Sequence, residues 1–220
     1  MEGVDLVTIR GALISFVILL GSLCVREWAH AFMAGKLGDP TPGMDGRLTL
    51  NPSAHIDLFG TILFPFACVF FLHGNLLFGW AKPVITNPSY FRHRTRDSML
   101  CAIAGPLANF AIALIAAIVG KFVFAINPST VELFGRLLLI NVVLAVFNLL
   151  PIPPLDGGPV LRYVTGMSEE TFMRLSQWGG LILLAIWLVP VLNQMVGLLI
   201  AIGASPFVGI FPQALRWLQM

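Results

Sequence analysis

A long apolar run near the start of the chain ends in the stretch VREWAHAFMAGKLGD, residues 25–39. It carries three neighbouring ionisable side chains, Arg26, Glu27 and His30. On a helix, Arg26 and His30 share a face, because residues i and i+4 lie above one another. Ionisable groups are costly inside a membrane, so each of these residues is a candidate for function. The stretch therefore predicts an apolar helix that carries a polar site.

The composition of the chain indicates a membrane protein. Of its 220 residues, 57% are hydrophobic and 11% are charged, and the mean hydropathy is +0.88. A soluble domain is about 25% charged, so lipid is the expected solvent of this chain. The formal net charge is +2 and no basic run with interleaved aromatics occurs, which argues against nucleic-acid binding. Cys24, Cys68 and Cys101 lie apart in apolar runs and are expected to be buried, not paired or metal-bound.

Apolar runs divide the chain into candidate spans of about 20 residues or more. The runs cover residues 7–36, 58–80, 98–124, 133–150 and 178–211. The last run is long enough for two passes, with a break expected near Pro190 and Asn193. The pattern predicts an all-α polytopic membrane protein with about five to six transmembrane helices. We expect a single integral-membrane domain over residues 1–220, with a core at about 7–165 and C-terminal helices at about 172–215.

Some β-structure is expected in the polar stretches between these runs. The segment Arg47-Leu48-Thr49-Leu50 alternates polar and apolar residues between Gly and Pro, which is typical of a short strand. Residues 81–85 are strand-like too, so the two segments are expected to form a small β-hairpin or sheet. Its edge would suit an extended client strand, or the hairpin would cover a polar cavity as a lid.

A basic cluster follows at residues 82–96 and predicts the orientation of the chain. Lys and Arg residues gather in loops on the cytoplasmic side of membrane proteins, so this loop is expected to face the cytosol. The cluster consists of Lys82, Arg92, His93, Arg94 and Arg96.

The polar site on the first helix is most of a zinc-protease motif. In an H-E-x-x-H helix, two histidines at i and i+4 hold zinc and the glutamate activates the bound water. Here Glu27 and His30 match, while Arg26 stands in the first position. A third ligand must come from elsewhere, and the candidate is Asp156 in NLLPIPPLDGGPVLR, residues 148–162, on a turn rich in Pro and Gly.

The number of membrane crossings limits how His30 and Asp156 can meet. They reach the same side only if the chain crosses an even number of times between them. The run 58–80 would add a third crossing, and His73-Gly74-Asn75 interrupts it with a turn-like triplet. We therefore expect this run to be a re-entrant or interfacial segment.

Several motifs in order resemble the site-2 protease family of intramembrane zinc metalloproteases, in its short, compact form. They extend over residues 20–162 and include the N-x-x-P-x-x-x-x-D-G arrangement at Asn148, Pro151, Asp156 and Gly157. The full set is E-W-A-H-A (27–31), G-D-P-T (38–41), G-R-L-T-L-N-P-x-x-H-I-D (46–57), F-G-W-A-K-P-V (78–84), A-G-P-L-A-N (104–109) and N-L-L-P-I-P-P-L-D-G-G (148–158).

The resemblance implies a site and an activity. Zinc would be held by position 26, His30 and Asp156, with Glu27 as the general base. The family cleaves transmembrane segments of other proteins and reaches its metal from the cytosolic side. It also implies that the chain lies in a bacterial cytoplasmic (inner) membrane, with its site facing the cytosol.

Arg26 departs from the family at a ligand position. A guanidinium has no free lone pair and stays protonated, so it cannot ligate zinc. Two unit charges 4 Å apart interact by roughly 4 kcal/mol at an effective dielectric of about 20, and a divalent ion doubles that repulsion. We therefore predict no zinc in the chain as written, and a catalytically degenerate site. Arg26 is expected to pair with Asp156, near Glu27 or His30, and to replace zinc as a tie between helices.

Simpler roles remain open for each polar residue. Arg26 can extend its head group to the membrane interface, and His30 can be a hydrogen-bonded core histidine. His55 can be a substitute metal ligand or a loop histidine bonded to backbone. Asn109 and Asn148 can bind a substrate or partner, or serve as an interhelical contact and a helix cap, respectively.

Three functions follow from these alternatives. The preferred one is a degenerate site-2-protease-like pseudoenzyme that binds a membrane client, either a membrane protein or a transmembrane peptide, or serves as a subunit of a membrane complex. The second is an active zinc-dependent intramembrane endopeptidase with an irregular metal site at His30, Asp156 and another ligand such as His55. The third is an enzyme whose histidine at position 26 has been replaced. In each case the surroundings include the lipid bilayer and no nucleic acid.

Overall fold

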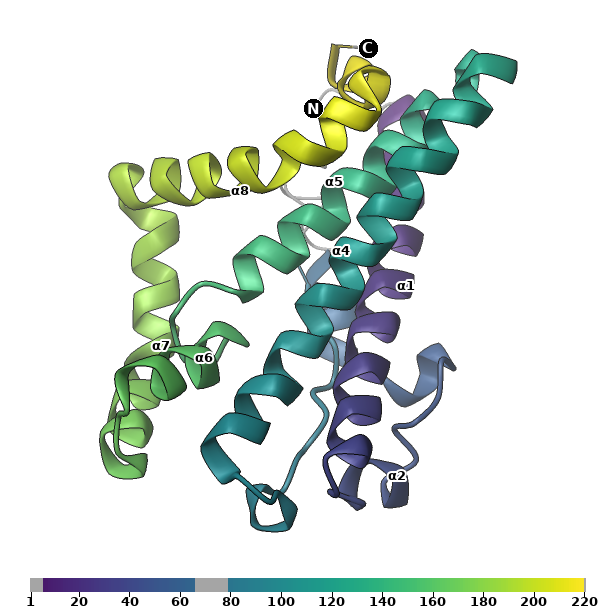
Figure 1. Cartoon of the computed structure of the whole chain (residues 1–220). Coiled ribbons are helices and arrows are strands. Elements are labelled where there is room, and N and C mark those ends of the chain that lie inside the picture. Colours follow the sequence, from purple (N-terminus) through teal and green to yellow (C-terminus); the bar gives the residue numbers. More distant parts are fainter. Residues whose placement is uncertain (1–5, 66–78, 220) are drawn as a thin grey trace.

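The computed structural model of the chain describes residues 6–65 and 79–219, and these are almost entirely helical (Figure 1). The long helices are α1 (Leu6–Lys36), α4 (Arg94–Ile126), α5 (Val131–Asn148), α7 (Glu169–Leu188) and α8 (Pro190–Ile210). Two short helices, α2 (Thr41–Met44) and α6 (Gly157–Thr165), lie between them. Within residues 6–65 and 79–219, five segments are long and apolar enough to cross a membrane, in agreement with the predicted helical, polytopic class. They are Ile9–Lys36, Arg94–Ile126, Pro128–Asn148, Glu169–Leu188 and Pro190–Ile210.

Helices α1, α4 and α5 form the packed centre of the molecule. In Figure 1, α1 and α4 run side by side and α5 packs against them. Small residues of α4, such as Ala113 and Ala117, are fully buried against Leu138 and Val142 of α5. Small side chains let helices approach closely, which is how helices associate where lipid removes the hydrophobic driving force. Cys24 and Cys101 are buried and free as predicted, while Cys68 lies outside the described residues.

A buried amide network joins the same three helices. Asn109 Nδ2 of α4 donates to Asn141 Oδ1 of α5 at 2.9 Å. Asn141 Nδ2 donates in turn to Ser22 Oγ of α1, also at 2.9 Å. Both amide side chains are fully buried, so a broken contact would leave polar atoms without water.

Replacing Asn141 with leucine is expected to lower the unfolding free energy by about 1–3 kcal/mol, because Asn109 Nδ2 would keep only the longer, 3.4 Å contact to the Ser22 carbonyl and the Ser22 hydroxyl would lose the Asn141 donor. Thermal unfolding of the purified protein in detergent measures the effect. Asn193→Leu on the exposed surface of α8 is the matched control and should change little. Equal effects of the two substitutions would contradict a structural role for the network.

The segment 58–80 has its two described ends in contact. A helical turn covers Leu58–Leu63, and the Trp80 N–H donates to the Gly60 carbonyl at 3.0 Å. The Thr61 hydroxyl also donates to the Trp80 carbonyl at 2.7 Å. Gly60, Thr61 and Trp80 therefore lie side by side, while the predicted re-entrant course of the segment falls on residues outside those described. The predicted break at His73–Asn75 lies outside the described residues.

The predicted β-hairpin is wrong for the residues that the structure describes. Residues 47–50 and 81–87 contain no strand, and 81–87 have no regular secondary structure. The Lys82 N–H donates to the His55 carbonyl at 2.9 Å, and side chains accept two further backbone N–H groups of the segment. Glu27 accepts the Val84 N–H at 2.9 Å and Asp39 accepts the Asn87 N–H at 2.6 Å. Residues 81–87 are therefore held to α1 by Glu27 and to the turn after α1 by Asp39.

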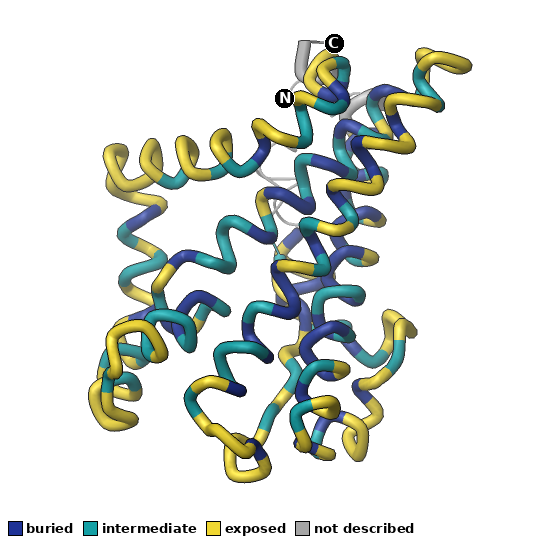
Figure 2. Tube along the Cα trace, viewed as in Figure 1, coloured by how far each residue is buried: buried dark blue, intermediate teal, exposed yellow. Residues whose placement is uncertain are grey.

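The two C-terminal helices separate at Val189, just before Pro190, close to the predicted break. Helix α7 begins earlier than the apolar run suggested, at Glu169. The Ser168 hydroxyl accepts the Thr171 N–H at 3.2 Å, and acidic residues in the first turn suit the positive helix end. Figure 2 shows that α7 and α8 are mostly exposed. Their exposed residues include Leu181, Leu188, Leu198 and Ile202, which would face lipid.

Candidate functional site

Two distant parts of the chain meet at the site. Helix α1 carries Arg26, Glu27 and His30, Asn148 is the last residue of α5, and Asp156 ends the connection from α5 to α6. Prolines after Asn148 prevent α5 from continuing, because proline lacks the N–H that a helix interior requires. The chain therefore turns back toward α1 and presents Asp156 just before α6 begins.

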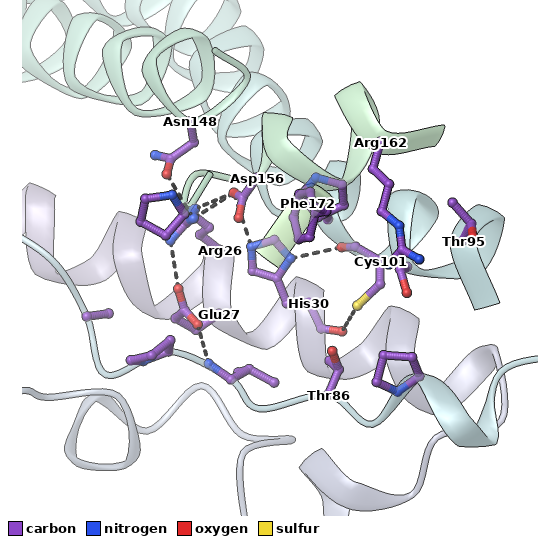
Figure 3. Close-up of a pocket in the computed structure, with 18 of the residues that line it drawn as sticks. Arg26, Glu27, His30, Thr86, Thr95, Cys101, Asn148, Asp156, Arg162 and Phe172 are labelled. Carbon is purple, nitrogen blue, oxygen red and sulfur yellow. Dashed lines mark hydrogen bonds and ion pairs between the residues drawn. The ribbon is translucent and has the colours of Figure 1, made fainter. Parts of the chain in front are cut away.

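Arg26 is the centre of the site and donates to three side chains (Figure 3). Its Nε and Nη2 lie 3.1 and 2.6 Å from Asp156 Oδ2. Nη1 donates to Glu27 Oε1 at 2.7 Å, and Nη2 also donates to Asn148 Oδ1 at 2.9 Å. The side chains of Arg26 and Asp156 are only 13% and 14% exposed. Arg26 thus forms the expected pair with Asp156, with Glu27 beside it, and its head group is largely buried within the protein.

His30 is fixed by α4 on one side and faces Asp156 on the other. Its Nδ1 lies 2.9 Å from the Cys101 carbonyl, which can only accept, so Nδ1 is the donor. Its Nε2 is buried 3.4 Å from Asp156 Oδ2, an ion-pair distance when the ring is protonated, and no described residue gives it a hydrogen bond. The imidazole is therefore oriented toward the carboxylate that Arg26 binds.

Glu27 has both carboxylate oxygens engaged. Oε1 accepts from Arg26, and Oε2 accepts the Val84 N–H at 2.9 Å. The residue is 3% exposed. Glu27 therefore joins α1 to residues 81–87, and neither of its carboxylate oxygens is free of hydrogen bonds.

The charge of Asp156 is stabilised by its neighbours. Burial by itself would raise the pKa of this carboxyl group, but the Arg26 guanidinium and then His30 lower it further than burial raises it. The net effect holds the pKa of Asp156 below its ordinary value, so the carboxylate is ionised and the ion pair with Arg26 is maintained.

His55 has the loop role that the sequence allowed. It is 1% exposed, and its Nε2 lies 2.8 Å from the Thr49 carbonyl. Within residues 6–65 and 79–219, no group of three or more His, Cys, Asp and Glu side chains is placed to hold a metal ion.

The two candidate asparagines are in different places. Asn148 lines the site, where it accepts from Arg26 and donates to the Leu144 carbonyl at 2.7 Å. Asn109 belongs to the buried amide network with Asn141 and does not line the cavity. Asn109 therefore makes a contact between helices, one of the two roles that the sequence left open for it.

The site forms one wall of a cavity of about 540 Å³. Sequence reasoning missed its opposite wall, where Arg162 Nη2 binds Glu169 Oε2 at 2.6 Å and the guanidinium lies over the Phe172 ring, 5.7 Å from its centre. The remaining wall includes Thr95 and Ser98 of α4.

The residues at the site do not fit a zinc ion. A catalytic zinc site needs three protein ligands and an open position for water. Here His30 and Asp156 are two potential ligands, and Arg26 places a donor-only cation against the carboxylate. An ion between His30 and Asp156 would have to displace the guanidinium from its acceptors.

Comparison with known proteins places the chain in a family. The fold and site define a polytopic helical membrane protein with a buried ionic site on its first helix. Residues 123–189 match peptidase family M50. The "Putative zinc metalloprotease YwhC" of Bacillus subtilis (strain 168) is 33% identical over 183 residues, which cover 79% of this chain and 80% of that protein. The chain belongs to peptidase family M50, the site-2 protease family, and is an integral membrane protein.

Other relatives are similar over shorter shares of their length. The "Putative zinc metalloprotease Rip2" of Mycolicibacterium smegmatis is 31% identical over 180 residues, 80% of this chain and 66% of that protein. The "Zinc metalloprotease MJ0392" of Methanocaldococcus jannaschii is 45% identical over 62 residues, 28% of this chain and 18% of that protein. No solved structure matches the chain.

Proposed function

We propose that this M50 protein binds a membrane client in its cavity and does not cut it. The observation that carries the proposal is the position of Arg26, which occupies the first ligand position and donates to Asp156, Glu27 and Asn148 at once. The client would be a membrane protein or a transmembrane peptide, held alone or within a larger membrane assembly.

The absence of cleavage follows from what the chemistry requires. Peptide hydrolysis by this motif needs a water molecule activated by a metal and by a glutamate that is free to take its proton. Both oxygens of Glu27 already accept hydrogen bonds, and Arg26 repels a divalent ion. With Arg26 at this position, the site therefore cannot form the metal-activated water on which the family's chemistry depends.

The cavity suits an apolar segment with a few polar backbone groups. Its lining combines Trp80, Val84 and Phe172 with the hydroxyls of Thr95 and Ser98. Ligand sites commonly have this mixture of apolar walls and a few polar contacts. The nearby basic residues of the 82–96 loop support an opening toward the cytosol, because positive loops stay on that side.

A photo-crosslinking residue placed at Phe172 is expected to capture the client in the native membrane, because Phe172 lines the cavity. The same residue at Leu198, which is 62% exposed on α8, is the control and should capture mainly lipid. An adduct from Phe172 whose protein partner remains full length supports binding without cleavage. Adducts at equal levels from both positions, or a client found only as fragments, would contradict the proposal.

A further inference from the structure

We infer that Arg26 acts as a built-in cation that takes the structural place of a metal ion, inside a ligand set that is otherwise still arranged for one. The inference deepens the proposed function, since it rests on the same replacement, and adds that a single substitution returns metal binding. Its three supporting observations are the contacts of the guanidinium, the geometry of His30 and Asp156, and the space left by α4.

The guanidinium does what a structural metal does, since it joins separate segments through one positive centre. Its donors reach Asp156 and Asn148 across 130 and 122 residues of chain, respectively. A third donor holds Glu27 on its own helix. Breaking such a buried pair leaves uncompensated charge, so the tie between α1 and the α5–α6 connection should depend on Arg26.

The two remaining ligand groups are spaced as if they shared one ion. Tetrahedral zinc lies about 2.0–2.2 Å from each N or O ligand, so two of its ligand atoms stand about 3.3–3.5 Å apart. His30 Nε2 and Asp156 Oδ2 are 3.4 Å apart. His30 Nε2 is also buried, and among the described residues it makes no hydrogen bond.

The support behind His30 is that of a metal ligand. Metal-bound histidines usually donate their other ring N–H to a carbonyl or carboxylate, which fixes the ring. His30 Nδ1 makes this contact with the Cys101 carbonyl at 2.9 Å. Nε2 is therefore the ring nitrogen available for a ligand.

Helix α4 leaves the space that side chains at positions 26 and 30 require. A Cβ atom at Gly105 would collide with the His30 imidazole and would lie 2.9 Å from Arg26 Cγ. Because glycine stands there, α4 crosses α1 without a side chain between the helices. A histidine at position 26 would share its face with His30 and complete a His, His, Asp set.

The test compares the wild-type protein with Arg26→His and Arg26→Ala, each purified in detergent with and without zinc chloride. Zinc content is read by elemental analysis and stability by thermal unfolding. Both variants without zinc should melt about 10 °C below wild type, since each loses one member of a buried ion pair. With zinc, Arg26→His should bind about one ion per chain and regain most of the loss, whereas Arg26→Ala should not.

Arg162→Ala is the matched control, because this arginine lines the same cavity but pairs with Glu169, whose side chain is 70% exposed. It should lower the melting temperature only slightly and should not bind zinc. If neither position-26 variant accumulates, Arg26→His is expressed in zinc-supplemented and zinc-depleted medium, and folded yield is expected only with zinc.

Two results would overturn the inference. One is an Arg26→Ala protein as stable as wild type, which would mean that the guanidinium does not hold α1 to the α5–α6 connection. The other is an Arg26→His protein that gains no zinc, or whose folded yield zinc does not raise. Cleavage of a client by the wild-type protein would instead contradict the proposed function. Failure of this inference can therefore be distinguished from failure of the proposed function.

Discussion

Replacing Asp156 with alanine is expected to lower the unfolding free energy by about 3–5 kcal/mol, the cost of removing one partner from a buried ion pair. The Arg26 guanidinium would lose the acceptor of two of its hydrogen bonds, and His30 would lose the carboxylate that faces it. The remaining carboxylate, Glu27, is already engaged by the Val84 N–H. No described side chain around Arg26 stands ready to replace Asp156.

Thermal or denaturant unfolding in detergent measures this loss. Asp156→Asn keeps an acceptor of similar shape, so it should cost less than Asp156→Ala. Glu169→Ala removes a carboxylate from a more exposed pair at the same cavity and should cost at most about 1 kcal/mol. If Asp156→Ala unfolds like wild type, the ion pair does not hold the helices together.

Replacing Gly157 with alanine is expected to destabilise the protein by at least about 3 kcal/mol, the upper end of the cost of overpacking. A Cβ atom at this position would collide with the carbonyl oxygens of Leu149 and Leu150. Both are backbone atoms at the end of α5, so they cannot turn aside as a flexible side chain can. The turn would have to open, and Asp156 would move away from Arg26.

Gly21→Ala is the matched control for Gly157→Ala. It lies in α1, and a Cβ atom there meets nothing within 4 Å. Alanine is a better helix former than glycine, so this control should be neutral or slightly stabilising. Thermal unfolding of the Gly157→Ala and Gly21→Ala proteins reports their stability. The zinc content of Arg26→His combined with each of these substitutions reports whether Asp156 is still in place to bind the ion. A Gly157→Ala protein that matches Gly21→Ala in both would contradict the role of Gly157.

The pairing of Arg26 with Asp156 could be predicted from the sequence. Position 26 and Asp156 stand where the family has two ligands of one ion, and a buried guanidinium needs a carboxylate partner. The long spans could also be predicted, because a bilayer requires continuous apolar runs. These features depend on local pattern and on strong constraints of solvent and charge.

The β-hairpin could not be judged from the sequence. Within residues 81–85, the Val84 N–H goes to the Glu27 side chain and the Lys82 N–H to the His55 carbonyl, so no ladder with residues 47–50 forms. Alternation within a segment predicts an extended backbone and does not identify its hydrogen-bond partner. Helix α7 begins at Glu169, close to the expected start at about 172, and the Ser168 hydroxyl caps its first turn.

The far wall of the cavity was missed as well. Arg162 and Phe172 have no family motif around them, and their contact joins α6 to α7 only after the chain has folded. Their role at the cavity follows from the arrangement of helices and not from residue type or spacing.

The most direct test of the central claim is the zinc content of the wild-type protein. The purified chain is dialysed against trace zinc and measured by elemental analysis, with Arg26→His treated in the same way as the positive control. We predict far less than one zinc ion per wild-type chain, because Arg26 donates hydrogen bonds to Asp156 and cannot itself ligate the ion. Near-stoichiometric zinc in the wild-type protein would contradict this, and would mean that His30 and Asp156 bind metal with the help of another ligand.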